Sequence, residues 1–273
     1  MKIQYLGTGG SEGIPALMCT CDNCAKARKV GGRALRTRSQ ALVDDKLLID
    51  FTADTLAHTH SCGIDLSGVT DCLVTHNHYD HFHPVDLANY RPTHIHTPQG
   101  WHITFYGSEA VGEEAAKQLG NIDAFSFELM KEFVPVKVGD YAVTPLKAVH
   151  SANSGPLIYQ ISNGEKTMLY GTDTNYFHDS VWEYWAKTKP YFNMVTLDCT
   201  NSCKPLTYVG HMGLAENIKV RERMIEMGIA DKSTLFVCTH FSHNGITCIY
   251  EELVPVAEEK GFIISYDGMI LYI

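Results

Sequence analysis

The sequence lacks the features of a membrane-bound or exported protein. No stretch approaches the roughly 20 consecutive apolar residues that a membrane-spanning helix needs. The first residues, MKIQYLGTGG, contain no apolar run of the kind found in signal peptides. We therefore expect a cytoplasmic protein with no membrane partner.

Positive charge is scarce in this chain. Lysine and arginine together number 22, aspartate and glutamate number 31, and the formal net charge is -9 at pH 7. An acidic chain repels phosphate backbones, so a nucleic-acid partner would require a local basic patch and is not expected. The densest basic stretch covers residues 26–38. We interpret it as a solvated loop or helix edge, with a contact role as the alternative.

Repeats, low-complexity tracts and linker-like segments rich in glycine, serine or proline are also missing. A length of 273 residues permits one or two domains. Because no linker divides the chain, we predict a single domain over residues 1–273. Hydrophobic residues make up 45% of the chain and charged residues 19%, which is ordinary for a protein with a sizeable core and argues against disorder.

The chain has nine cysteines, an odd number, and they lack the spacing of a disulfide framework. Reduced thiols in a cytoplasm, some of them metal ligands, fit this pattern better. Cys19, Cys21 and Cys24 crowd into CTCDNC and offer three soft thiolates, but a tetrahedral zinc site needs a fourth ligand. His243 in CTHFSHNG is the natural candidate. A redox-active or merely buried cysteine tract remains the alternative.

Hydrophobic alternation and periodicity predict a mixed α/β fold. Strands are expected over 1–7, 39–50 (a hairpin turning near Asp44–Asp45), 71–76, 136–150, 157–173, 192–199, 234–241 and 262–273. Helices are expected over 52–60, 178–188, 213–228 and 251–261. Strands outnumber helices, and hairpins occur in both halves. This mix indicates two mixed sheets packed together and covered by helices.

The motif THNHYDH places four metal-capable side chains, His76, His78, Asp80 and His81, within six residues. In an extended segment, residues two apart point to the same side, so His76 and His78 can share one ion. After the chain turns, Asp80 and His81 can face a neighbouring ion. Imidazole and carboxylate ligands suit zinc, manganese or iron(II). The alternative is a surface loop that happens to be rich in histidine.

Further candidate ligands follow other predicted strands. His150 comes after PLKAV, Asp173 after MLYGT and His240 after LFVCT. An open α/β site is assembled in this way, from the carboxyl ends of several strands. The sequence therefore predicts a metal site rather than a chance run of histidines.

The order of these motifs resembles the metallo-β-lactamase superfamily: LGTGGSEGIP, THNHYDH, His150, GTDTN and CTHFSH follow one another along the chain. The resemblance implies the αββα sandwich of that superfamily, with two mixed β-sheets flanked by helices. It implies two divalent ions, zinc or manganese. The implied ligands are His76, His78 and His150 for the first ion and Asp80, His81 and His240 for the second, with Asp173 bridging the two.

The cysteine tract after GTGG…GIP, paired with CTHFSHNG, resembles the PhnP family of phosphoribosyl cyclic phosphodiesterases, as do VTLDC, GHMGL and YDGM. This resemblance implies one structural zinc at Cys19, Cys21, Cys24 and His243, which would tie the N-terminal loop to a late strand. It also implies that His211 is an unligated active-site histidine, as in ribonuclease Z. A surface histidine beside a helix is the alternative for His211.

The implied reaction is hydrolysis of a small cyclic or nucleotide-like phosphodiester. Two adjacent cations would lower the pKa of a bridging water, orient it for attack and neutralise phosphate charge. His211 would act as general acid, and with Asp80 it completes the predicted catalytic residues. The flexible arm that ribonuclease Z uses for tRNA has no Gly/Pro-rich counterpart here.

Two other functions remain open for such a protein. The same centre could hydrolyse a carboxylic ester, lactone or amide. The chain could also be a biosynthetic accessory protein of the PqqB type, which shares the layout and the cysteine tract. His94, His96 and His102 are interpreted as ordinary loop or strand residues. The oligomeric state is left open, a homodimer included.

Overall fold

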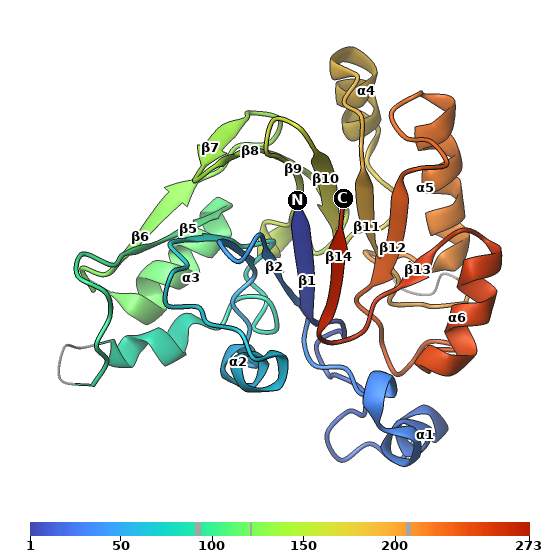
Figure 1. The fold of residues 1–273 in the computed structure, drawn as a ribbon, viewed down its shortest axis with the longest axis horizontal. Helices are drawn as coiled ribbons and strands as arrows, with labels where there is room; N and C mark the ends of the chain where they lie inside the picture. Colours follow the sequence, from blue (N-terminus) through green and yellow to red (C-terminus); the bar gives the residue numbers. More distant parts are fainter. Residues whose placement is uncertain (91–93, 121, 206–208) are drawn as a thin grey trace.

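The computed structural model describes residues 1–90, 94–120, 122–205 and 209–273. In this part of the chain, two seven-stranded sheets have the orders β14-β1-β2-β3-β4-β5-β6 and β13-β12-β11-β10-β9-β8-β7. Each sheet is antiparallel toward one end and parallel toward the other. The predicted pair of mixed sheets is confirmed (Figure 1).

The first sheet contains β1 (Lys2–Gly7), β2 (Gln40–Val43), β3 (Leu47–Ile49), β4 (Asp71–Leu73), β5 (Ile103–Gly107), β6 (Phe125–Leu129) and β14 (Met269–Tyr272). The second contains β7 (Val136–Val138), β8 (Tyr141–Lys147), β9 (Leu157–Ser162), β10 (Thr167–Gly171), β11 (Met194–Asp198), β12 (Leu235–Thr239) and β13 (Ile263–Ile264). The α-helices are α1 (Asp22–Val30), α2 (Thr55–Cys62), α3 (Glu109–Leu119), α4 (Asp179–Thr188), α5 (Leu214–Glu226) and α6 (Tyr250–Glu259). Short 3₁₀ turns cover η1 (Gly32–Ala34), η2 (Pro84–Asn89) and η3 (Ala152–Ser154).

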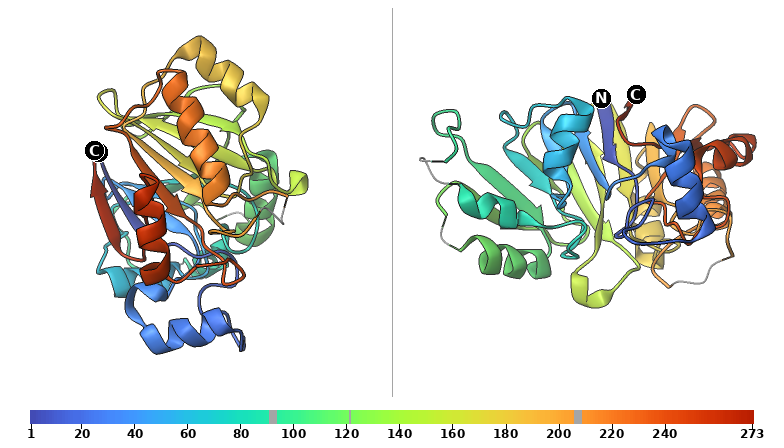
Figure 2. Two further views of the ribbon diagram at one scale, coloured as in Figure 1. Left: turned by 90° about the vertical axis from the view of Figure 1, so that its right-hand side faces the viewer. Right: turned by 90° about the horizontal axis from the view of Figure 1, so that it is seen from below.

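Alternation along the strands sorts the core into layers. In β10, Met168 and Tyr170 pack between the two sheets, whereas Leu169 between them faces the helices. Successive strand residues point to opposite faces, so one strand supplies both layers. Figure 2 shows the sheets from two further sides, with helices on their outer faces. The result is the αββα sandwich that the sequence predicted.

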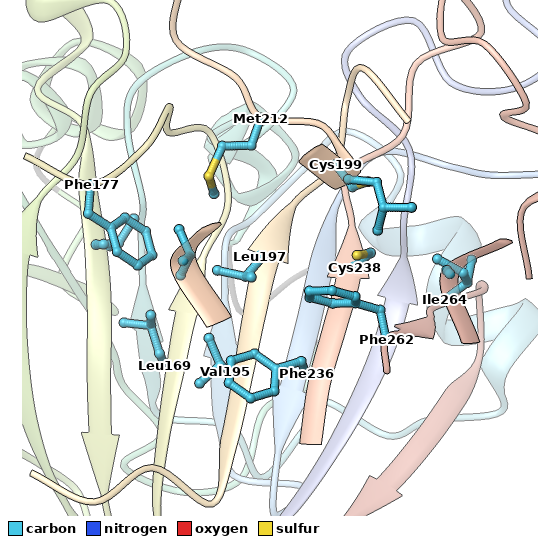
Figure 3. Close-up of a cluster of buried hydrophobic side chains, with 14 of the residues drawn as sticks. Leu169, Phe177, Val195, Leu197, Cys199, Met212, Phe236, Cys238, Phe262 and Ile264 are labelled. Atoms are coloured by element: carbon cyan, nitrogen blue, oxygen red, sulfur yellow. The ribbon is translucent and has the colours of Figure 1, made fainter. Parts of the chain in front are cut away.

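A large apolar layer lies between the second sheet and its helices. Leu169, Val195, Leu197 and Phe236 from β10, β11 and β12 are buried there, as the close-up in Figure 3 shows. Burial of each such side chain stabilises the fold by about 1.5–3 kcal/mol. No helix in the described part of the chain is long and apolar enough to span a membrane.

The basic stretch at 26–38 corrects one prediction. Its first half forms α1 and Lys26 pairs with Glu252 at the surface, with 2.7 Å between Nζ and Oε1. Arg36, however, is buried, and its guanidinium carbon lies 4.0 Å from the centre of the Phe241 ring. Arg36 Nη1 donates to the Ser265 carbonyl oxygen at 2.7 Å. The solvated helix edge therefore holds for the exposed Lys26, Arg28, Lys29 and Arg33, whereas Arg36 departs from it, because this cation anchors the loop to the core.

Candidate metal centre

The predicted metal ligands meet at one edge of the two packed sheets. His76 and His78 follow β4 of the first sheet, whereas His150, Asp173 and His240 follow β8, β10 and β12 of the second. Strand β9 is antiparallel to both β8 and β10, so these two strands point the same way, and β10, β11 and β12 are parallel. The strand ends, and the side chains after them, are thereby brought to a common edge.

The first group of donors consists of three imidazoles. His78 Nδ1 lies 2.9 Å from His76 Nε2 and 3.4 Å from His150 Nε2. Ligand atoms of all three residues lie within 4.8 Å of one another. Donors of a tetrahedral zinc ion with Zn–N bonds of about 2.0–2.1 Å are about 3.3–3.4 Å apart, so the spacing fits a divalent ion.

The second group lies beside the first and mixes imidazole with carboxylate. His81 Nε2 is 3.3 Å from Asp80 Oδ2 and 3.3 Å from His240 Nε2. All three residues are buried. Burial lowers the pKa of His81, but the carboxylates of Asp173, Asp80 and Asp50 raise it well above the usual value. Surroundings that favour a proton on the His81 ring also favour a metal cation in place of that proton.

Asp173 lies between the two groups. Its Oδ2 is 3.1 Å from His81 Nε2 and 3.1 Å from His240 Nε2, and its Oδ1 is 3.8 Å from His150 Nε2. Asp173 Oδ2 is buried and accepts no hydrogen bond. A buried carboxylate oxygen without a donor is costly unless a cation compensates it. The donor sets and this oxygen therefore fit the two divalent ions that the superfamily implies.

Asp50 supports the second group, although the sequence analysis did not identify it. It is buried, and its backbone adopts a φ of 66° directly after β3. His81 Nδ1 donates to Asp50 Oδ2 at 2.7 Å, and the Thr75 amide donates to Oδ1 at 2.7 Å. Such a partner fixes the ring orientation and leaves Nε2 free for a metal. The available signal was an aspartate ending the buried strand LLID.

Asp198 plays a similar part at the end of β11 and was also missed. Its carboxylate accepts three hydrogen bonds: from His211 Nδ1 at 2.9 Å, from the Met212 backbone amide at 2.9 Å and from the Asp173 backbone amide at 3.1 Å. Its Oδ2 lies 3.4 Å from His240 Nδ1. One buried carboxylate therefore orients both His211 and His240, and the signal for it was VTLDC.

His211 lies beside the two groups but belongs to neither triad of ligands described above. Its ring stacks on that of His240 with 5.5 Å between centroids. Burial lowers the pKa of His211, but the charge and hydrogen bond of Asp198 raise it to about 9. Its donor atom also lies within 4.8 Å of donors from Asp173, Asp198 and His240. Within this group, His211 faces Asp198, with 2.9 Å between Nδ1 and Oδ2.

A cleft opens above these side chains. Its volume is about 480 Å³. The residues that line it are Gly10, Ser11, Glu12, His78, Tyr79, Asp80, His150, Asp173, Thr200, His211, His240, Ser242 and Asn244. Both proposed ion sites and His211 are thus accessible to a small ligand from the same side.

The cysteine cluster also comes together in space. His243 Nδ1 lies 3.4 Å from Cys21 Sγ and 3.7 Å from Cys19 Sγ, and Cys24 completes a group within 4.8 Å. The Cys24 backbone amide donates to Cys21 Sγ at 3.5 Å, and the Ala16 backbone amide donates to Cys24 Sγ at 3.3 Å. Backbone hydrogen bonds lower the pKa of the Cys19 and Cys21 thiols. Three sulfurs and one imidazole nitrogen at these spacings suit tetrahedral zinc.

The other histidines singled out in the sequence lie outside these clusters. His94 and His96 are exposed. His102 Nε2 lies 2.8 Å from Ser126 Oγ, and its Nδ1 lies 3.1 Å from the Asp123 carbonyl oxygen. Among the described residues, none of the three belongs to a group of potential metal ligands.

Comparisons with known proteins agree with this geometry. A model of the β-lactamase superfamily domain matches residues 46–241, a span that contains every proposed ligand of the two catalytic ions. The curated proteins include no match to this sequence. Cys19, Cys21, Cys24 and His243 lie outside the matched span.

Several solved structures share the fold along the whole chain. A diphosphatase of the PhnP family is 20% identical, with a TM-score of 0.76 and coverage of 99% of this chain and 97% of that one. Zinc-bound PqqB from Methylobacterium extorquens is 15% identical, with a TM-score of 0.75 and full coverage of both chains (100% each). The short human tRNase Z is 14% identical, with a TM-score of 0.66 and coverage of 100% and 99%. With its matched domain and its αββα architecture, the chain belongs to the β-lactamase superfamily and has the metallo-β-lactamase fold.

Proposed function

We propose that this protein is a metal-dependent hydrolase that cleaves a small cyclic or nucleotide-like phosphodiester. The observation that carries the proposal is the arrangement on the floor of the cleft. Two adjacent donor groups share Asp173, and His211 lies beside them with Asp198 behind it. The likeness to a PhnP-family diphosphatase and to tRNase Z supports chemistry on phosphate esters.

The residues divide the work of such a reaction. His76, His78 and His150 would hold one divalent ion, and Asp80, His81 and His240 the other, with Asp173 bridging. When bound, the ions supply a water of lowered pKa and neutralise charge on the phosphate oxygens. His211 uses Nδ1 to donate to Asp198, so Nε2 remains to deliver a proton to the leaving oxygen. Asp198 stabilises the protonated imidazole before that transfer.

His211→Ala should retain both ions and lose rate. General acid catalysis contributes about 10²–10⁴-fold, so we expect kcat on an alkoxide-leaving diester to fall within that range. Elemental analysis should give the same metal content as the wild type, since His211 is outside both triads. Full activity of His211→Ala on every substrate found would contradict the role as acid or phosphate contact.

The substrate class is tested by comparing the rates at which the protein hydrolyses different classes of substrate. With manganese or zinc supplied, we expect a higher kcat/KM for bis-p-nitrophenyl phosphate or a 2′,3′-cyclic nucleotide than for a monoester, a lactone or a β-lactam. The motivation is the PhnP-like motif set together with His211 beside the ions. A clear preference for lactones or thioesters would instead support hydrolysis of carboxylic esters, and a metal-loaded protein without turnover would support an accessory role of the PqqB type.

Further parts of the proposal concern the whole chain. We propose a structural zinc at Cys19, Cys21, Cys24 and His243, separate from the catalytic ions. We also propose one domain over residues 1–273, because β1 and β14 pair in one sheet with Lys2 opposite Tyr272. A reducing cytoplasmic compartment fits nine cysteines that are all free of disulfides. A small diester is the expected partner, and a homodimer is left to measurement.

A further inference from the structure

The cleft contains a carboxylate that the proposed reaction does not use. Glu12 lines the cleft, and 31% of its side chain is exposed. A Cβ atom placed on Gly10 would be 3.4 Å from His240 Cε1 and 3.9 Å from Glu12 Oε2. The Glu12 carboxylate and the ring of His240, a proposed metal ligand, therefore both flank Gly10, and both residues line the space that a substrate would occupy.

Both oxygens of Glu12 are held in place. Ser242 Oγ donates to Oε1 at 2.5 Å, and Ser11 Oγ donates to Oε2 at 2.9 Å. The backbone turn that carries Glu12 is held by a hydrogen bond from the Gly13 amide to the Gly10 carbonyl at 3.0 Å. Gly13 has a φ of 66°. The negative charge cannot turn away from an incoming anion without breaking these bonds.

The lining residues that contact Glu12 or its loop include Ser11, Tyr79, Ser242 and Asn244, which carry no charge. Arg38 does not line the cleft, although its Nε donates to the Ser11 carbonyl at 3.0 Å. Ser242 Oγ accepts from the Asn244 amide at 3.1 Å, and Tyr79 Oη donates to the Ser11 carbonyl at 3.4 Å. Tyr79 is 57% exposed, so an aromatic surface is open to a ligand. Hydroxyl groups and a nucleobase would find partners here, because stacking on such a ring tolerates any base. A phosphate group would meet a like charge instead.

We propose that Glu12 is a specificity-determining residue that disfavours substrates carrying a second phosphate group. The site would then select phosphodiesters whose remaining part is uncharged. This inference rests on the proposed function and deepens it. Specificity often depends on a repulsive element of this kind as much as on attraction. With Glu12 in the cleft, we expect phosphoribosyl cyclic phosphates, which carry a second phosphate, to be poor substrates. Nucleoside 2′,3′-cyclic phosphates should be better ones.

Two compounds that differ only in the second phosphate provide the test: adenosine 2′,3′-cyclic phosphate and its 5′-phosphorylated form. We expect kcat/KM of the metal-loaded protein to be about tenfold or more higher for the first, as for one like-charge contact in a partly exposed site. The ratio should fall toward one in Glu12→Gln and persist in Glu12→Asp. High salt should also reduce it.

Matched controls separate charge from structural damage. Glu132→Gln removes an exposed carboxylate that does not line the cleft, and should leave the ratio unchanged. Because Glu12 Oε1 lies 3.5 Å from His243 Nε2, zinc content and melting temperature are measured for each variant. A changed ratio in Glu12→Gln with unchanged zinc content and melting temperature assigns the effect to the charge.

A binding measurement distinguishes failure of this inference from failure of the proposed function. Calorimetry with adenosine 3′-phosphate and adenosine 3′,5′-bisphosphate requires no turnover. The role of Glu12 is supported if the wild type binds the bisphosphate more weakly than the monophosphate and Glu12→Gln binds the two equally. This result counts even if neither cyclic compound is cleaved and the phosphodiesterase proposal fails. Equal kcat/KM values and equal Kd values within both pairs would overturn the role of Glu12 and leave phosphodiester hydrolysis intact.

Discussion

Asp173→Asn should remove most of the catalytic metal and lower kcat/KM by about 10³-fold or more, since each ion contributes several kcal/mol to the transition state. The reason is the central place of this carboxylate, with Oδ2 facing His81 and His240 and Oδ1 facing His150. Asparagine has nearly the same shape but no charge, so it cannot offset two cations. Elemental analysis and steady-state kinetics provide the measurement, and far-UV circular dichroism should remain native because the site lies at strand ends.

Two comparisons make the Asp173 result specific. Asp140→Asn removes a surface carboxylate that pairs with Lys46 at 2.8 Å, and should change neither metal content nor rate. Asp80→Ala touches only the second donor group, so it should abolish turnover while the first ion is retained. An Asp173→Asn protein that keeps both ions and the wild-type rate would contradict the bridging role.

Cys24→Ser should lower the melting temperature without emptying the catalytic site. The cluster joins the loop before α1 and the first turn of α1 to the segment after β12, a cross-link across most of the chain. By analogy with a disulfide over a long loop, its loss should cost about 2–4 kcal/mol, or roughly 5–15 °C in a domain of this size. Calorimetry and a zinc count measure both effects.

The matched control for this prediction is Cys62→Ser, a half-buried cysteine outside the cluster, which should leave the zinc count unchanged. Thiolates hold zinc far better than manganese or magnesium. A mild chelator should therefore remove the catalytic ions and the activity first. His240→Ala, three positions before His243, should affect activity more than stability. If Cys19, Cys21 and Cys24 reacted freely with a thiol reagent in the metal-loaded protein, the structural zinc would be excluded.

Much of the fold could be predicted because strand alternation is a local property. The hairpin at Asp44–Asp45 and the strands around the Asn163–Gly164 turn appear where the sequence places them. No element was predicted over residues 91–120, although β5 and α3 lie within this segment. Gly112 inside α3 weakens the helical pattern, yet a Cβ there would lie 2.5 Å from the Phe127 ring. Close packing between distant segments requires this glycine, and the local pattern does not reveal it.

Helix α1 was missed for a related reason. Its N-cap is Cys21, whose sulfur accepts from the Cys24 amide at 3.5 Å, whereas serine, threonine, aspartate and asparagine are the usual caps. The proposed ligands of the catalytic ions were identifiable because four of them share one short motif and the others follow strands. Asp50 and Asp198 were not, because a single aspartate after a strand becomes informative only when its partners in space are known.

Each proposed metal site takes ligands from distant parts of the chain. His76 leaves the ribosome early, but the first set of ligands waits for His150 and the second waits for His240. The cysteine cluster waits for His243, long after Cys24 has emerged. Domains fold as units once enough of the chain is available, so metal loading follows the docking of the second sheet onto the first. Until β12 has joined the second sheet, the second set of proposed ligands is incomplete, so we expect the chain to bind both ions only once the two sheets have packed together.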